Sequence, residues 1–261
     1  MATAAAAHRI LVTGANKGIG RAIVEKLAAR NDVEKVFLGS RDEARGKAAA
    51  DAIASNKVAV LSLDVTSEES VRHAAEEAGE LTAIVNNAGV GFGRPVEETV
   101  DVNFFGTKRC CEAFQVSDRI VNIASASGPN YLSRCGDANR VNTLTNPNVS
   151  LEEILRICEE GLDDVGEAYG FSKALINAYT RWLSNASPNL VVNSCTPGYI
   201  LTDLTAGMGA TNPPEMGTVA PLSLLFRDAS ELGGGYYYGS DGLRSPLDKY
   251  REPGSPPYEG P

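Results

Sequence analysis

The feature that most constrains the fold is an apolar run that leads directly into a glycine-rich turn near the start of the chain. Residues 8–13 are mostly apolar and β-branched, as in a buried strand. Three glycines follow at the spacing G-x-x-x-G-x-G, namely Gly14, Gly18 and Gly20, and residues 19–27 then carry apolar side chains at helical spacing. Such a unit can bind a phosphate, because glycines expose backbone N–H groups and a helix N-terminus favours negative charge. A purely structural turn is the alternative, since the spacing is neither G-x-G-x-x-G nor that of a Walker A loop.

Strands and helices alternate along the rest of the chain. A capping box at Thr66 and Glu69 predicts that a helix begins there, and residues 219–226 are apolar and predicted to be helical. This rhythm is typical of an α/β fold with a doubly wound parallel sheet. Further strands are predicted over residues 35–40, 58–65, 83–87, 119–125, 190–196 and 235–239.

Charge and composition narrow the classes of partner. The chain has 261 residues and a formal net charge of −9, which argues against a general affinity for nucleic acid or an anionic membrane. The five cysteines form no C-x-x-C pair, so we expect reduced thiols in a cytoplasmic compartment. Two histidines make a metal site improbable, and no apolar run approaches the ~20 residues of a membrane span. Residues 1–7 are expected to be a flexible leader without the features of a signal peptide.

The end of the second predicted strand bears on which dinucleotide could bind. An NAD site usually carries an acidic residue there, which accepts a hydrogen bond from the ribose 2′-OH. Here Arg41 and Lys17 would place two positive charges where the 2′-phosphate of NADP lies. Alternatively, Arg41 faces solvent and Asp42 senses the ribose. Asp64 and Val65, at the end of the next strand, would lie beside the adenine in this architecture.

A tyrosine and a lysine four positions apart, Tyr169 and Lys173, would lie one turn apart on the same face of a helix. A free tyrosine titrates at ~10, and a nearby cation favours the phenolate. Such a pair can give a proton to a developing alkoxide or take one from an alcohol. The same spacing also occurs by chance on helix surfaces.

Four motifs occur together in register. They are T-G-x-x-x-G-I-G from Thr13, N-N-A-G at residues 86–89, Y-x-x-x-K from Tyr169 and P-G from Pro197. With these motifs the chain resembles the short-chain dehydrogenase/reductase family over about residues 8–240. The resemblance implies a single Rossmann-type domain that transfers hydride between a nicotinamide cofactor and a carbonyl or alcohol carbon.

The resemblance also implies roles for four catalytic residues. Tyr169 would be the proton donor, and Lys173 would activate it and contact the ribose. Ser125 would hydrogen-bond the substrate carbonyl, with Ser127 as a weaker candidate. Asn103 would hold a water that links the lysine to solvent. The alternatives are a strand-end hydroxyl for Ser125 and a helix side chain bonding backbone for Asn103.

The remaining implied contacts concern the cofactor. The small residues at 87–89 allow close approach of a ribose. Ile200 would bond the carboxamide through its backbone, and Thr202 would lie near the phosphates. The predicted cofactor-binding residues for NADP(H) are Gly14, Asn16, Lys17, Gly18, Ile19, Gly20, Arg41, Asp64, Val65, Asn87, Ala88, Gly89, Tyr169, Lys173, Pro197, Gly198, Ile200 and Thr202.

Residues 126–166 form an insertion that most family members lack. Ser150 and Glu153 fit a capping box, and Gly161 fits a helix stop. The insertion resembles that of the monomeric carbonyl reductase branch, whose added helix covers a face that other members use for association. An interface is the alternative role for its apolar stripe, and the segment between Gly89 and Asn103 is shorter than in that branch. The stripe consists of Leu151, Ile154, Leu155, Cys158 and Leu162.

These observations give one domain over residues 8–242, followed by a proline-rich surface tail at 243–261. Residues 205–214 are predicted to form a mobile segment over the pocket. We predict a monomer that reduces a small hydrophobic aldehyde or ketone with NADPH, with Tyr169 as proton donor. NADP-dependent alcohol oxidation and a non-catalytic NADP(H)-binding sensor are the alternatives. The predicted pocket lining is Val90, Gly91, Phe92, Ala126, Tyr199 and the segment near Met208.

Overall fold

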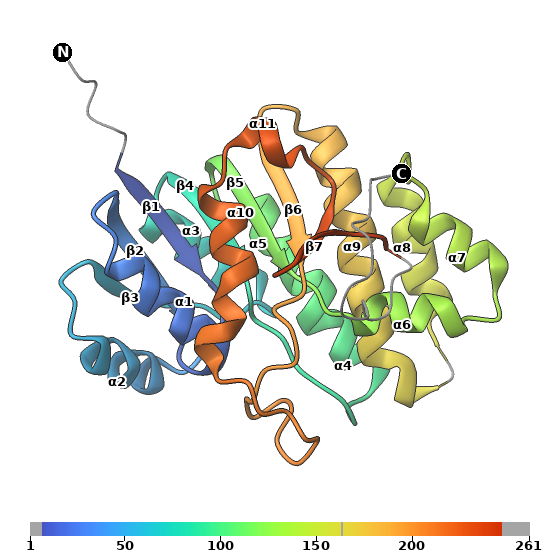
Figure 1. Cartoon of the computed structure of the whole chain (residues 1–261), viewed down its shortest axis with the longest axis horizontal. Helices are drawn as coiled ribbons and strands as arrows, with labels where there is room; N and C mark the ends of the chain where they lie inside the picture. Colours follow the sequence, from blue (N-terminus) through green and yellow to red (C-terminus); the bar gives the residue numbers. More distant parts are fainter. Residues whose placement is uncertain (1–6, 163, 247–261) are drawn as a thin grey trace.

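Eight strands form one sheet in the computed structural model, which describes residues 7–162 and 164–246 (Figure 1). The strand order is β3-β2-β1-β4-β5-β6-β7-β8. The strands from β3 to β7 are parallel, and β8 runs antiparallel to β7. The predicted doubly wound α/β fold is confirmed. The winding reverses at β1 and β4, which is where open sheets of this kind hold their ligands.

The strands differ from their predicted bounds mainly at the ends. β3 ends at Ser62, so Asp64 and Val65 lie in the loop after it, and β5 ends two residues before Ser125. β8 was not predicted, and it extends the sheet into the predicted tail. The leader at 1–6 and the tail at 247–261 lie outside the described residues. The strands are β1 (His8–Val12), β2 (Val33–Ser40), β3 (Val58–Ser62), β4 (Leu81–Asn86), β5 (Val116–Ile123), β6 (Val191–Cys195), β7 (Tyr237–Gly239) and β8 (Gly242–Arg244).

Helices cover both faces of the sheet, because parallel strands joined by right-handed crossovers are buried on both sides. Ile10 and Val12 belong to the core under one set of helices, and Leu11 and Ile84 to the core under the other. The first set is α1 (Gly18–Ala28), α2 (Glu43–Ile53), α10 (Val219–Phe226) and α11 (Ala229–Leu232). The second includes α3 (Glu68–Ala78), α4 (Val96–Val100), the π-helical turn η1 (Asp101–Phe105), α5 (Gly106–Ala113) and α9 (Ala168–Ala186).

The predicted capping box at Thr66 and Glu69 is wrong by one residue. Ser67 is the N-cap of α3, and its hydroxyl accepts a hydrogen bond from the Ser70 N–H. The hydroxyl of Thr66 instead donates to the Asp64 carboxylate at 2.8 Å. The carboxylate therefore holds Thr66 in the loop, and the helix begins after it.

The insertion contains three helices where one was predicted. They are α6 (Ser127–Arg134), α7 (Ala138–Thr145) and α8 (Leu151–Glu160), and they gather beside α9 (Figure 1). The capping box of Ser150 with Glu153 is confirmed, and Gly161 follows the last residue of α8. A short 3-10 turn, η2 (Val165–Glu167), leads into α9, and a second, η3 (Pro214–Thr218), leads into α10.

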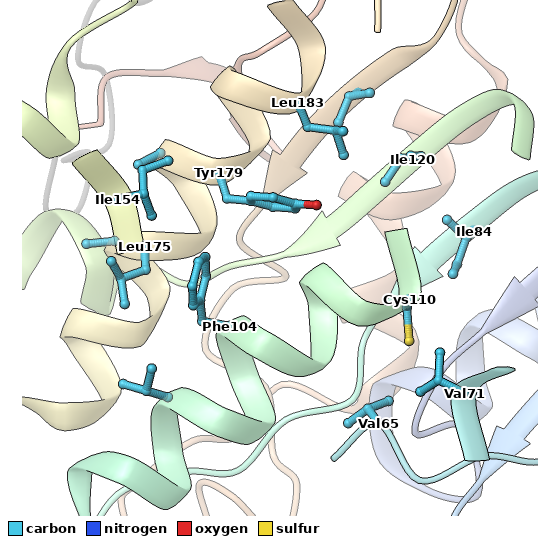
Figure 2. Packing of buried hydrophobic residues seen from close by; sticks show 14 of the residues in the cluster. Val65, Val71, Ile84, Phe104, Cys110, Ile120, Ile154, Leu175, Tyr179 and Leu183 are labelled. Atoms are coloured by element: carbon cyan, nitrogen blue, oxygen red, sulfur yellow. The ribbon is translucent and has the colours of Figure 1, made fainter. Parts of the chain in front are cut away.

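The insertion shares the main hydrophobic core. Figure 2 shows Ile154 of α8 close to Leu175 of α9, with Phe104 and Tyr179 beside them. Ile154 and Ile157 are fully buried, although the predicted stripe did not include Ile157. α8 is thus part of the domain rather than an appendage.

Close backbone packing brings α6 against the first turns of α9. A Cβ on Gly170 would lie 2.8 Å from the carbonyl oxygen of Ser127 and from Cβ of Tyr131, and a Cβ on Gly128 would lie 3.0 Å from the backbone at Lys173. Only glycine permits this approach. It places the loop after β5 next to Tyr169. Within the described part of the chain, no helix is both long and apolar enough to cross a membrane.

Candidate active site

A cleft of about 1370 Å³ lies at the carboxyl ends of the parallel strands. Every residue predicted to bind the cofactor lines it, from the glycine turn after β1 to the loop after β6. Of the predicted catalytic residues, Ser125, Tyr169 and Lys173 also line the cleft, whereas Asn103 is buried behind its wall. The winding of the sheet therefore brings together residues that are far apart in the sequence.

The glycine turn is built so that backbone, and not side chains, forms this part of the cleft. Gly14 and Gly18 have φ angles of 61° and 55°, which favour glycine. A Cβ on Gly14 would lie 2.7 Å from Cα of Ala88, and one on Gly20 would lie 2.8 Å from the carbonyl oxygen of Gly14. No side chain of the described residues caps the N-terminus of α1. These features fit the pyrophosphate of a dinucleotide.

Thr13 and Asn87 fasten the ends of β1 and β4 together. The hydroxyl of Thr13 accepts hydrogen bonds from the backbone N–H groups of Asn87 and Ala88, at 3.0 and 2.9 Å. The amide of Asn87 donates to the carbonyl oxygens of Thr13 and Gly14. Thr13, the first residue of the first motif, thus has a structural role that was not predicted.

Lys173 is buried in the wall of the cleft. Its ammonium donates a hydrogen bond to the carbonyl oxygen of Ile123 at 2.9 Å and lies 5.6 Å from the centre of the Tyr169 ring. Burial lowers the pKa of Lys173 to about 8, and the neighbouring Cys195 thiol opposes this shift. The lysine is therefore poised to exchange a proton near neutral pH.

Ser125 lies in the loop after β5, which places it at the same edge of the sheet. Its hydroxyl accepts a hydrogen bond from the Ser127 N–H at 3.2 Å and donates to the Ser127 hydroxyl at 3.3 Å. The two predicted serine candidates are thus one hydrogen-bonded pair at the start of α6. Both line the cleft.

Asn103 acts as a clamp between two elements. Its amide oxygen accepts from the Val90 N–H at 2.8 Å, while its amide nitrogen donates to the Val90 carbonyl and to the Ser172 hydroxyl. A Cβ on Gly89 would lie 3.1 Å from the Asn103 amide oxygen and 3.7 Å from the Lys173 nitrogen. The Asn103 side chain hydrogen-bonds backbone groups, as the alternative interpretation expected. Gly89 lies between it and the ammonium of Lys173.

At the other end of the cleft, basic residues surround the loop after β2. Arg41 and Arg45 both line the cleft. Arg45 pairs with Asp42 at 3.3 Å, and the Asp42 carboxylate also accepts from the Arg45 N–H as the N-cap of α2. Lys17 pairs across the cleft with Asp203 at 2.5 Å and holds the pKa of that carboxyl below its usual range.

The segment at 200–205, which we call the strap, contacts both walls of the cleft. The Thr205 hydroxyl accepts from the Thr202 N–H and donates to the Ile200 carbonyl, which fixes the turn. Asp203 then pairs with the glycine turn, and a Cβ on Gly91 would lie 2.6 Å from Cγ of Leu204. Residues 205–214, predicted to be mobile, continue from this strap.

Comparison with known proteins identifies the family of this chain. A model of the short chain dehydrogenase family matches residues 8–135. Carbonyl reductase (NADPH) 3 of Rattus norvegicus is 31% identical over an alignment that covers 86% of this chain and 93% of the relative. This chain belongs to the short-chain dehydrogenase/reductase family. It is therefore an oxidoreductase, and the resemblance to carbonyl reductases is confirmed.

Two further proteins extend the comparison. Carbonyl reductase (NADPH) 1 of Bos taurus is 32% identical, with 84% of this chain and 91% of the relative covered. Salutaridine reductase from Papaver somniferum is 26% identical and has a TM-score of 0.77, with 88% of this chain and 99% of that chain covered. The match to almost the whole of the salutaridine reductase structure shows that this chain shares its fold.

Several cleft residues of this short-chain dehydrogenase/reductase escaped the sequence analysis. Arg45 lies one helical turn after Arg41, a spacing that could have indicated it. Asp203, Leu204 and Arg244 enter the cleft from the strap and from β8. Nothing in their local sequence signals this position, because it depends on how the chain returns after β6.

Proposed function

We propose that this enzyme reduces a small hydrophobic aldehyde or ketone with NADPH, with Tyr169 as the proton donor. The proposal is supported by the Lys173 ammonium, which lies 5.6 Å from the centre of the Tyr169 ring and binds the Ile123 carbonyl, two residues before Ser125, in the same cleft. NADPH, when bound, would supply the hydride. The relatives from Rattus norvegicus and Bos taurus are both named carbonyl reductase (NADPH), which agrees with the direction of reduction.

Each side chain then has a defined task. The Tyr169 hydroxyl gives its proton to the carbonyl oxygen, and the Ser125 hydroxyl turns its hydrogen from Ser127 to donate a hydrogen bond to the same oxygen. Ser127 orients Ser125. The Lys173 ammonium stabilises the phenolate left on Tyr169 and returns a proton to it, and Asn103 supports this relay from behind Gly89.

Preference for NADP over NAD is supported by the charges at the adenosine end. Arg41, Arg45 and Lys17 all line the cleft, and Arg41 is the one of the three with no ion pair among the described residues. The Asp42 carboxylate, which could otherwise sense a ribose hydroxyl, caps α2 and pairs with Arg45. Five free cysteines in the described chain are compatible with the proposed cytoplasmic location.

The decisive experiment is the Tyr169→Phe variant, assayed by NADPH oxidation with simple aldehydes, ketones and quinones. We expect kcat to fall by about 10²–10⁴-fold, because the general acid is lost, while NADPH affinity changes little. Tyr236→Phe, a change outside the cleft, is the matched control and should retain full activity. An active Tyr169→Phe enzyme would refute the proposal.

The same assay separates the two alternatives. A sensor would bind NADPH and turn over no carbonyl compound or alcohol in either direction. An enzyme that works as an alcohol dehydrogenase would show its higher kcat/KM with NADP and the alcohol at neutral pH. If the protein is a reductase or an alcohol dehydrogenase, Tyr169→Phe should lose both the reduction and the oxidation activity. A sensor has no activity to lose, and activity from a contaminant would not respond to the substitution.

A further inference from the structure

An aromatic contact places a second ring against the proposed proton donor. The centres of the Phe92 and Tyr169 rings are 4.5 Å apart, and the rings are tilted by 54°. Tyr169 is 8% exposed, whereas Phe92 is 47% exposed and lines the cleft. A ring that touches the proposed acid and still presents half its surface is placed to contact whatever the acid protonates.

The loop that carries Phe92 is held firmly on one side. Asn103 fixes the backbone of Val90 through two hydrogen bonds, and Gly91 packs against the side chain of Leu204, which would have to shift to admit a Cβ there. On the other side, Gly93 has a φ of 78° and open space where a Cβ would be. The chain is therefore anchored just before Phe92, and the Phe92 ring itself rests against Tyr169.

Other large apolar side chains face the same cleft. Tyr199, Leu201 and Met208 are 43%, 48% and 47% exposed, and all three line the cleft with Phe92. The Tyr199 hydroxyl donates to the Met208 carbonyl oxygen, so its ring remains as an apolar surface. Exposed apolar groups gathered in a concave site are typical of a site for an apolar ligand.

Apart from the Lys173 ammonium assigned to catalysis, two arginines that line the cleft are paired with carboxylates. Arg94 pairs with Glu98, and Arg244 pairs with Asp241. An uncharged ligand therefore suits the wall better than a carboxylate or an amine. Flat aromatic groups match Phe92 best, because two rings at offset or tilted geometry gain energy beyond their buried area.

We propose that Phe92 is a specificity-determining residue that selects aryl carbonyl substrates over saturated ones of the same size. The aryl group stacks on the exposed face of Phe92 while its carbonyl oxygen meets Tyr169. This inference rests on the proposed reductase function and adds the substrate class to it.

The test compares two aldehydes of similar size, benzaldehyde and cyclohexanecarbaldehyde, in wild type and Phe92→Leu. Leucine keeps an apolar side chain but removes the ring. We expect kcat/KM for benzaldehyde to fall about fivefold, and that for cyclohexanecarbaldehyde to stay within about twofold. Met216→Ala, which changes an exposed apolar side chain outside the cleft, is the control and should leave both values unchanged.

A binding measurement separates this inference from the proposed function. Benzamide and cyclohexanecarboxamide carry the same groups but are not reduced, and they can be titrated into NADPH-saturated protein. We expect wild type to favour benzamide and Phe92→Leu to lose that preference, even if neither aldehyde is turned over. The role of Phe92 would be overturned if Phe92→Leu changed the affinities for the two amides equally, if it changed neither affinity, or if benzamide did not bind. Normal turnover with those results would leave the reductase function standing.

Discussion

At the scale of single residues, the environment of Lys173 controls the proposed chemistry. The ammonium is buried and keeps the Ile123 carbonyl as a hydrogen-bond partner, and its pKa falls from 10.5 to about 8. A lowered lysine pKa means that the neutral form becomes populated earlier as pH rises. The protonated form, which supports donation by Tyr169, therefore prevails below about pH 8.

The pH profile of reduction should report this group. We expect kcat/KM for the aldehyde to be level below about pH 8 and to fall by roughly tenfold per unit above it, since the proton is then missing. The oxidation direction should rise over the same interval. Lys26→Met, a change on the surface of α1, should keep the profile. A level profile from pH 6 to about 10 would contradict this role for Lys173.

Cofactor choice is also decided by single residues. Arg41→Asp replaces a cation near the expected 2′-phosphate with an anion that suits a ribose hydroxyl. We expect the affinity for NADPH to fall by about 10–100-fold and that for NADH to rise, as measured by calorimetric titration of both cofactors. Arg72→Asp, a similar change on α3 away from the cleft, is the control. An unchanged preference would mean that Arg41 only faces solvent.

At the scale of elements, the contact between α6 and α9 holds the catalytic corner together. Gly170 and Gly128 remove the Cβ atoms that would separate the helices. α6 begins at Ser127 and α9 carries Tyr169, so this spacing sets the distance between the serine pair and the proton donor. A change in the packing of α6 on α9 would therefore change the geometry of the proposed catalytic residues.

Gly170→Ala tests this coupling. The new methyl would lie 2.8 Å from the Ser127 carbonyl oxygen, so α6 must move away. We expect the free energy of unfolding, measured by chemical denaturation, to fall by about 1–3 kcal/mol, and kcat to fall as well. Gly136→Ala adds a methyl where nothing lies within 4 Å and should change neither quantity. Equal behaviour of the two variants would show that the contact is not tight.

At the scale of the whole molecule, the insertion bears on association. The apolar side of α8 is already used, because Ile154 and Ile157 are fully buried against the same core as Leu175 (Figure 2). Of the predicted stripe, Ile154 is fully buried, and its other members, Leu151, Leu155, Cys158 and Leu162, are partly buried against the same core. We therefore propose a monomer, because packing within the chain already uses much of the stripe.

The expected mass in solution follows from that burial. Light scattering after size-exclusion chromatography should give the mass of one chain, 27.5 kDa, across a tenfold range of concentration. Leu151→Asp, a change at the partly buried edge of the stripe, should leave that mass unaltered. A concentration-dependent dimer that the same variant dissociates would show that the insertion forms an interface.

The sequence by itself determined those features that depend on local chemistry. The glycines of the first turn, the alternation of strands and helices, and the Ser150 capping box each follow from the backbone needs of a few neighbouring residues. They fixed the fold class and the edge of the sheet where a site must lie. Local rules were weaker where neighbours compete, as when Asp64 takes the hydroxyl of Thr66 and shifts the start of α3.

Only the tertiary structure decided how distant groups meet. The low pKa of Lys173 comes from its burial, and the pairing of Lys17 with Asp203 comes from the path of the segment at 200–205. The Phe92–Tyr169 contact joins the loop after β4 to helix α9, which lies far away in the chain. Such contacts carry no local signature, because their energy depends on which side chains the folded chain brings within a few ångströms, and that is a property of packing rather than of sequence spacing.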